Sequence, residues 1–464
     1  MKKIITLFLL LSIFHTSFAS AEIPGREYYE KRAEELKDLR WGMFICWSFS
    51  TFSGSEWTPT RDKDVSFFRA ETVDTDQWAR TAKEAEMGYI LFLTKHHDGF
   101  CLWDTATTEK KVTNAPLGVD VLAELKKSCD KYGIKLAIYF SEADWDDPNS
   151  PGDGHGQGAK DPERKKAQLK ELLTNYGPIE YIWFDHAVGD GGLSHEKTVK
   201  FCHEIQPHTL IGFNHGESAG EVRVGERGRP SPLSDFSGAG PYNQDASVFQ
   251  GFLVAEFTYP ILPPCGGGAD WFYSLPIHDG LCHTPRKIHA DYLGAVKHRN
   301  IFCLNVGPDY EGNLREIDVQ TLRKVGDKIR SGEIPGDSLS RGKPATASSQ
   351  WDDEHRAQMA VDHDPGTRWG AAHNSRSGWL EVDLREPKTF SRVMIDDTQF
   401  PRTEEFLIEY RDDPSEAWKT AFHGGKIGGD EDFTFPAVTG RYVRLNILKA
   451  NEVPTIWEFQ VYEK

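Results

Sequence analysis

Residues 74–98, DTDQWARTAKEAEMGYILFLTKHHD, contain the repeating unit that decides the fold. Trp78, Ala82 and Ala85 recur at helical spacing and predict an amphipathic helix that Gly88 ends. The apolar run that follows predicts a buried strand, and two histidines and an aspartate come directly after it. A buried strand joined to an amphipathic helix is the unit of a parallel sheet covered by helices.

The same alternation of apolar runs and helical patterns fills residues 36–330. Besides YILFLTKHH, the runs are WGMFICWSF, IKLAIYFSEADW, EYIWFDHA, TLIGFNH, FLVAEFTY and NIFCLNVGP. Seven strands, with one weak strand left unrecognised, predict an α/β fold of the (β/α)8 barrel type. A doubly wound open sheet is the alternative, but no GxGxxG or P-loop turn follows the first strand.

The pattern of apolar and polar residues changes after residues 331–343. These residues are rich in Gly, Pro and Ser and predict a linker. Short alternating runs separated by turn residues follow, such as GWLEVDL, EFLIEYRD and RYVRLNIL. They predict an all-β sandwich or jelly roll of about 120 residues. We therefore expect a barrel domain at 22–335 and a β domain at 340–464.

The N-terminal residues predict export. Residues 1–21 contain two lysines, an apolar core and the small residues Ala19-Ser20-Ala21, which is the layout of a secretory signal peptide. Their apolar run is too short to cross a bilayer, so we expect an exported protein, periplasmic or extracellular, without a membrane span. The seven cysteines show no CxxC pair or zinc spacing, and the net charge of -17 argues against nucleic acid as a partner.

Polar residues at strand ends predict where the chemistry lies, because the carboxyl ends of barrel strands meet at one mouth. These residues are His96, His97, Asp185, Asn214, Glu256 and Asn305. Asp185 is either a catalytic carboxylate or a helix N-cap. The histidines could bind a metal, serve a Ser-His-Asp triad, or hydrogen-bond sugar hydroxyls while two carboxylates act. HExxH and GxSxG are absent, so the third interpretation is favoured.

Four segments carry a family resemblance: WGMFICWSFSTFSGSEW, YILFLTKHHDGFCLWDT, YIWFDHA and CLNVGPDYEGNL. They resemble glycoside hydrolase family 29, the retaining α-L-fucosidases, over residues 36–330. The resemblance implies a (β/α)8-like barrel, a fucosylated glycan or oligosaccharide as substrate, and double displacement through a covalent glycosyl-enzyme. It implies no cofactor for catalysis.

The resemblance also assigns site residues. Asp185 of WFD matches the nucleophile, and Glu226 in VRVGERG resembles the acid/base of the linkage-selective subfamily. Glu256 in LVAEFTYP resembles the acid/base position of the broader subfamily and is the alternative. Glu226 could also be an ordinary solvated acid among charged neighbours. The expected substrate-binding residues are Cys46, Glu56, Trp57, His96, His97, Tyr139 and Trp271.

Two residues depart from the family pattern. Cys46 replaces a histidine, and a thiol is a poor hydrogen-bond donor to a sugar hydroxyl. His186 replaces the glycine of WFDG. A related sugar, an α-L-galactoside or a modified fucose, is therefore an alternative substrate. A non-catalytic glycan-binding protein, or a metallo-hydrolase that uses His96 and His97, would also fit these residues.

The C-terminal residues 340–464 have a resemblance of their own. ATASSQW, AVDHDPGTRWGA and GWLEVDL resemble the discoidin-like, factor 5/8 C-type sandwich, which also occurs in carbohydrate-binding modules. The resemblance implies a structural calcium held by Asp362, Asp364, Thr367 and Glu458. A tight Asx-type turn without metal is the alternative. The domain could bind sugar or brace the barrel, and no sequence feature indicates an oligomeric state.

Overall fold

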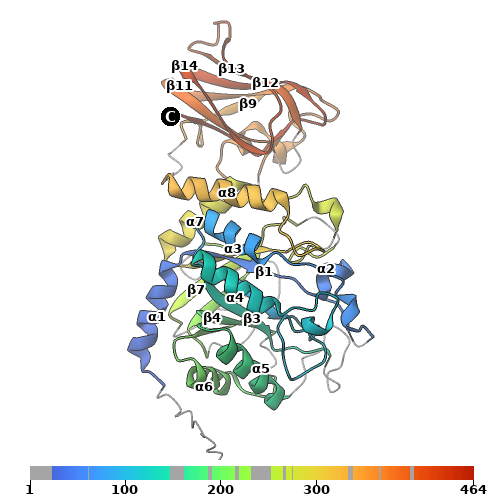
Figure 1. The fold of residues 1–464 in the computed structure, drawn as a ribbon. Coiled ribbons are helices and arrows are strands. Elements are labelled where there is room, and N and C mark those ends of the chain that lie inside the picture. Colours follow the sequence, from blue (N-terminus) through green and yellow to red (C-terminus); the bar gives the residue numbers. More distant parts are fainter. Residues whose placement is uncertain are drawn as a thin grey trace, which may run out of the picture.

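The computed structural model describes residues 23–60, 62–146, 161–186, 191–214, 219–230, 252–264, 268–273, 275–332, 338–364, 367–397 and 402–463. The predicted signal peptide, residues 1–21, lies outside these ranges. Within them, no helix is both long and apolar enough to cross a membrane. Figure 1 shows a barrel surrounded by helices and, beyond helix α8, a separate layer of strands.

Eight parallel strands close a barrel in chain order, β1 to β8. They are β1 Trp41–Ile45, β2 Tyr89–Lys95, β3 Lys135–Ser141, β4 Tyr181–Asp185, β5 Leu210–Phe213, β6 Val222–Glu226, β7 Val254–Pro260 and β8 Ile301–Val306. The helices are α1 Arg26–Asp38, α2 Phe49–Ser53, α3 Thr75–Glu84, α4 Val121–Tyr132, α5 Pro162–Asn175, α6 His195–Ile205, α7 Pro285–His298 and α8 Glu316–Arg330. The predicted (β/α)8-like barrel is confirmed.

The strand that the sequence pattern did not reveal is β6. Its sequence, VRVGE, has only two apolar side chains, separated by Arg223 and followed by a glycine. Arg223 is nevertheless buried, and β6 pairs in parallel with both β5 and β7. Because β6 ends on Glu226, the missed strand carries one of the two candidate acid/base residues.

The ends of α3 and α4 test the helix signals of the sequence. The side chain of Asp74 accepts a hydrogen bond from the backbone of Gln77 and caps the start of α3. The predicted stop at Gly88 is wrong, because α3 ends at Glu84 and Glu86 adopts the left-handed conformation, with φ of 62°. Gly88 is required for another reason, since a Cβ there would lie 2.7 Å from the backbone oxygen of Leu39. At the end of α4, Gly133 is left-handed, with φ of 70°, and is the C-cap of the helix.

The C-terminal domain is antiparallel. Its strands are β9 Ala345–Ala347, β10 Trp369–Gly370, β11 Gly378–Asp396, β12 Thr403–Arg411, β13 Lys419–Gly424, β14 Asp430–Ala450, β15 Thr455–Ile456 and β16 Glu458–Tyr462. One sheet has the order β13-β12-β14-β11-β16, with β9 on β11, and β10 pairs with β15. The domain has an apolar core of its own, which confirms the predicted all-β domain.

The two domains touch through α7 and α8, and Figure 1 shows α8 between the barrel and the β domain. The backbone N–H of Arg286, in the first turn of α7, donates to Asp430 of β14 at 3.0 Å. Lys328 of α8 lies 3.7 Å from Asp432. The first turns of a helix leave N–H groups without partners inside the helix. The β domain therefore supplies part of the cap of a barrel helix.

Candidate active site

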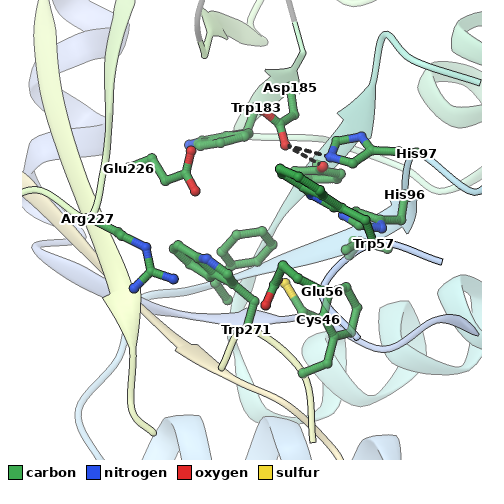
Figure 2. Close-up of a pocket in the computed structure, with 14 residues that line it drawn as sticks. Cys46, Glu56, Trp57, His96, His97, Trp183, Asp185, Glu226, Arg227 and Trp271 are labelled. Atoms are coloured by element: carbon green, nitrogen blue, oxygen red, sulfur yellow. Dashed lines mark hydrogen bonds and ion pairs between the residues drawn. The ribbon is translucent and has the colours of Figure 1, made fainter. Parts of the chain in front are cut away.

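A cavity of about 220 Å³ opens at the carboxyl ends of the barrel strands. Nine of the residues expected at the site line it: Cys46, Glu56, Trp57, His96, His97, Tyr139, Asp185, Glu226 and Trp271. Figure 2 shows Glu226 and Asp185 turned into the cavity, with Cys46, Glu56 and Trp271 across from Asp185. The volume is below that of sites for drug-sized ligands and suits a single sugar ring.

The sequence pattern did not assign the remaining lining residues: Phe44, Leu93, Trp183, Arg227 and Phe272. A period-2 signal could have found two of them, since alternate residues of a strand share a face. Phe44 stands two residues before Cys46, and Trp183 two residues before Asp185. The aromatic rings give the cavity the apolar walls on which a sugar can pack.

Asp185 is the last residue of β4 and is surrounded by hydrogen-bond donors. Its Oδ2 accepts from the Tyr139 hydroxyl at 2.6 Å, and its Oδ1 accepts from the Asn214 side-chain nitrogen and from the His186 backbone, both at 2.8 Å. The Nε2 atom of His97 lies 3.6 Å from Oδ2. Donors of this kind favour the ionised form of a carboxyl group, which is the form a nucleophile needs.

Glu226 and Asp185 share one donor. The Nδ2 atom of Asn214 donates to Glu226 Oε2 at 2.9 Å and to Asp185 Oδ1 at 2.8 Å. The two N–H bonds of an amide diverge by about 120°, so straight hydrogen bonds along them put the two acceptor oxygens about 5 Å apart. Retaining glycosidases hold their two carboxyl groups about 5–5.5 Å apart, whereas inverting enzymes need a wider gap.

Glu256 lies deeper in the barrel and does not line the cavity. In the register between β6 and β7, Glu256 is level with Val224, and Thr258 is level with Glu226. Two residues of a strand span about 7 Å, which places Glu256 well below the mouth. Its Oε2 accepts from the indole nitrogen of Trp183 at 3.0 Å, and burial raises its pKa to about 8.

On the side of the cavity across from Asp185, Glu56 and Cys46 are uncharged and Arg227 is cationic. Burial and the neighbouring carboxylate of Asp270 raise the pKa of Glu56 to about 8, so Glu56 is mostly protonated at neutral pH. Burial also raises the pKa of the Cys46 thiol, which therefore stays neutral. Arg227 carries the positive charge; its guanidinium donates to Asp270 at 2.7 and 2.9 Å.

The adjacent histidines His96 and His97 form one wall of the cavity. The rings of His96 and His97 lie 4.0 Å apart, and burial lowers the pKa of His96 to about 3. The Nδ1 atom of His97 hydrogen-bonds to the Ser141 hydroxyl at 2.7 Å, which fixes the ring. Among the described residues, no group of three or more His, Cys, Asp and Glu side chains is arranged to hold a metal ion. Neutral imidazoles can both donate to and accept from sugar hydroxyls.

His186 stands where the backbone enters the left-handed region, with φ of 53°. Glycine adopts this conformation freely, whereas other residues are strained in it. The departure from WFDG therefore places a strained residue directly after Asp185. Its imidazole ring lies 4.1 Å from the ring of His97.

In the C-terminal domain, the residues expected to hold calcium gather oxygen atoms around Thr367. The Thr367 hydroxyl lies 3.2 Å from the Met359 carbonyl, 3.0 and 2.9 Å from the two Asp362 carboxylate oxygens, and 3.1 Å from the Asp364 carbonyl. One hydroxyl proton cannot satisfy four acceptors. The Asp364 backbone also donates to Asp362, which is the Asx-type turn expected as the alternative.

Glu458 is the fourth residue expected to hold the calcium. Its Oε1 atom is buried and has no hydrogen-bond partner among the residues that the structure describes. Burial, together with the carboxylates of Asp362 and Asp396, raises its pKa to about 7. A buried oxygen without a donor, in a carboxyl group that interacts electrostatically with Asp362, fits the all-oxygen shell that Ca²⁺ prefers.

Two family profiles match this chain, one in each domain. A family profile described as "Alpha-L-fucosidase" matches residues 24–331, and one described as "F5/8 type C domain" matches residues 344–459. "Putative alpha-L-fucosidase 1" of Oryza sativa subsp. japonica is 28% identical over 90% of this chain and 82% of its own. "Alpha-L-fucosidase 1" of Arabidopsis thaliana is 26% identical over 92% of this chain and 86% of its own.

Solved structures share the fold. A putative alpha-L-fucosidase from Bacteroides thetaiotaomicron superimposes with a TM-score of 0.53 at 22% identity, covering 96% of this chain and 98% of its own. A Ruminococcus gnavus GH29 fucosidase, solved in complex with fucose, superimposes with a TM-score of 0.51 at 22% identity, covering 96% of this chain and 97% of its own.

Proposed function

Since the chain belongs to the alpha-L-fucosidase family, we propose that it releases terminal α-L-fucose from glycans or oligosaccharides by a retaining double displacement. Asp185 is the nucleophile and Glu226 is the acid/base. The protein acts after export, in the periplasm or outside the cell, as the composition of residues 1–21 suggests. The Ruminococcus gnavus relative solved with fucose supports the choice of sugar.

The reaction has two steps that exchange roles between the carboxyl groups. First, the Asp185 carboxylate bonds to C1 of the sugar while Glu226 gives its proton to the departing glycosidic oxygen. Then Glu226 takes a proton from water, the water oxygen bonds to C1, and the bond to Asp185 breaks. The sugar leaves with its anomeric configuration retained, and both carboxyl groups return to their starting states.

The observation that carries this proposal is the bridge through Asn214. A single amide nitrogen within 2.9 Å of both carboxyl groups sets a spacing of about 5 Å between their oxygens. That spacing leaves no room for a water between Asp185 and C1, so it supports direct attack by Asp185. Glu256, level with Val224 and below the cavity, is not placed for either role.

The test is hydrolysis of an aryl α-L-fucoside by the full chain and three variants: Asp185→Ala, Glu226→Ala and Glu256→Gln. We expect the first two to lose at least about 10³-fold in kcat, because each removes a group that bonds to or protonates the reacting atoms. Added azide should restore turnover to Glu226→Ala by replacing water at C1. Loss of activity in Glu256→Gln, with Glu226→Ala still active, would reverse the assignment of the acid/base.

We also propose that Asp362, Thr367, Glu458 and the Asp364 carbonyl hold a structural Ca²⁺ in the β domain. The ion would neutralise the crowded oxygens and tie the loop at Asp362 to the start of β16 at Glu458. No catalytic role follows from it, because none of these residues lines the cavity.

A further inference from the structure

We propose that Asn214 is a positioning residue that places the acidic proton of Glu226 on Oε1 and stabilises the negative charge as it passes from Asp185 to Glu226. The inference rests on the proposed function and extends it, since the sequence marks Asn214 only as a polar strand end. Asn214 follows β5 directly and is buried, with 1% of its surface exposed.

The orientation of the Asn214 amide follows from its partners. Asp185 is the ionised partner, and an ionised carboxylate only accepts hydrogen bonds, so the nitrogen and not the oxygen must face it; the same nitrogen contacts Glu226. Each of the two N–H bonds then has its own acceptor, Oδ1 of Asp185 at 2.8 Å and Oε2 of Glu226 at 2.9 Å. The backbone N–H of Asn214 donates to the Phe184 carbonyl at 2.7 Å, which anchors the residue next to β4.

The hydrogen bond to Oε2 selects which oxygen of Glu226 carries the proton. A carbonyl oxygen of a carboxylic acid accepts hydrogen bonds better than its hydroxyl oxygen does. With Oε2 occupied by the Asn214 donor, the proton of the acid form lies on Oε1. Figure 2 shows the carboxyl group of Glu226 turned into the cavity, where the leaving oxygen of a glycoside would lie.

Asn214 also donates to whichever of the two carboxyl groups is charged during the reaction. Before the first step Asp185 is anionic and Glu226 is neutral. When the bond to C1 forms and Glu226 has given up its proton, Asp185 is an ester and Glu226 is anionic. One amide group donates to the anion in both states, so no donor has to move while the charge crosses the site.

The experiment compares kcat and the pH profile of kcat/KM for the full chain and Asn214→Ala, with an aryl α-L-fucoside as substrate. We expect kcat to fall about 10²–10³-fold, the loss seen when one donor to a developing anion is removed. Both limbs of the profile should move to higher pH by about one unit, because each carboxyl group loses a donor to its ionised form. Asn214→Asp, which keeps the shape and adds an anion, should move them further.

Asn305→Ala is the matched control. Asn305 is also a buried strand-end asparagine, but its amide donates to the Phe44 carbonyl and not to a carboxyl group. It should lower the thermal stability and leave both limbs in place. If Asn214→Ala behaves like Asn305→Ala, with unmoved limbs, Asn214 only packs and the inference is wrong. Should Asn214→Ala fail to fold, the isosteric Asn214→Asp decides the question by the same criterion.

A second measurement separates this inference from the proposed function. Carbon-13 NMR can follow the titration of the Asp185 and Glu226 carboxyl groups, with Asp185→Asn and Glu226→Gln as assignments. If the unaltered protein hydrolyses no α-L-fucoside, the proposed function fails, but the titration still reports on Asn214. Unchanged titration of both groups in Asn214→Asp would overturn the inference whether or not the protein is active.

Discussion

The hydroxyl of Tyr139 donates to Oδ2 of Asp185 at 2.6 Å, and both residues are buried on neighbouring strands. A hydrogen bond to a charged group contributes about 1.5–3 kcal/mol, so this contact favours the carboxylate form of Asp185. Tyr139→Phe keeps the ring and removes the donor.

For Tyr139→Phe we therefore expect the acidic limb of the kcat/KM profile to move to higher pH by about one to two units. At neutral pH kcat/KM should fall about 10- to 100-fold, which corresponds to the same loss of free energy. The same aryl α-L-fucoside assay, run from acidic to mildly alkaline pH, measures both. Tyr259→Phe, whose hydroxyl donates to Asp291 away from the cavity, is the control. An unmoved acidic limb in Tyr139→Phe would contradict the assigned contact.

Glu256→Gln should make the protein more stable at high pH. Burial raises the pKa of Glu256 from 4.5 to about 8, so between these values the folded chain binds a proton that the unfolded chain does not. The free energy of unfolding therefore falls as the pH rises from about 4.5 to about 8. Glutamine never ionises, and its carbonyl can still accept from Trp183.

Thermal unfolding at about pH 5 and about pH 8 checks this expectation. Relative to the unaltered protein, Glu256→Gln should show little change in Tm at the lower pH and a gain of about 4 °C or more at the higher pH. A gain of equal size at both pH values would mean that ionisation of Glu256 is not its cause.

Cys46→Ser should strengthen sugar binding. The serine hydroxyl has nearly the size of the thiol and is a better hydrogen-bond donor. A neutral hydrogen bond contributes about 0.5–1.5 kcal/mol, so KM for the cognate sugar should fall about 2- to 10-fold. Cys303→Ser, buried beneath the cavity and outside its lining, should leave KM unchanged.

This pair of variants is best assayed on aryl α-L-fucoside and aryl α-L-galactoside side by side. The sugar whose KM responds to Cys46→Ser is the one that places a hydroxyl against residue 46. A rise in KM for both sugars would mean that the thiol packs against an apolar part of the substrate.

His186→Gly should relieve backbone strain. The φ of 53° at His186 is free for glycine and costs another residue about 1–2 kcal/mol. We expect Tm to rise by about 2–4 °C, measured by differential scanning calorimetry. If the imidazole has no part in the reaction, kcat stays within about threefold; a larger loss would show that the strain is kept for its contact with His97.

Calcium removal should loosen the β domain and leave the chemistry intact. With Ca²⁺ at about 100 to 1,000 times its Kd, binding to the folded chain alone adds about 3–4 kcal/mol to the stability. A chelator should therefore lower the unfolding temperature of the β domain, and added Ca²⁺ should restore it. Asp362→Asn should abolish the response, and Asp353→Asn, an exposed acid in the same domain, should not.

Activity on the aryl fucoside is followed in the same samples. It should survive the chelator, because the proposed chemistry uses only carboxyl groups. Activity that is lost on chelation and recovered with a transition metal would instead favour a metallo-hydrolase.

Much of the fold was readable because the barrel strands are continuous apolar runs. β6 was not, because Arg223 interrupts the apolar run and leaves only the alternate residues Val222 and Val224 apolar. The predicted helix end at Gly88 is wrong for a related reason. Glycine there answers a steric demand from Leu39, a contact between segments that no local signal reports.

The sequence predicted which residues gather at the candidate site, but not how deep in the barrel each of them lies. Asp185, His96 and His97 follow apolar runs, so their place at the mouth could be read from the sequence. Glu226 and Glu256 could not be separated, because the answer depends on the register between β6 and β7. The bridge through Asn214 depends on three strand ends that are separated along the chain, and the pairing of β4 with β5 and of β5 with β6 brings them together.

The hydrogen bond from the Arg286 backbone to Asp430 reaches past the boundary between the two domains. Helix α7 is followed directly by β8, the strand that closes the barrel by pairing with β1. A chain cut at the linker would keep every residue of the cavity and still lose an acceptor at the start of that helix. Exchange of the C-terminal domain for an unrelated one would therefore remove this acceptor from the first turn of α7, directly before the strand that closes the barrel.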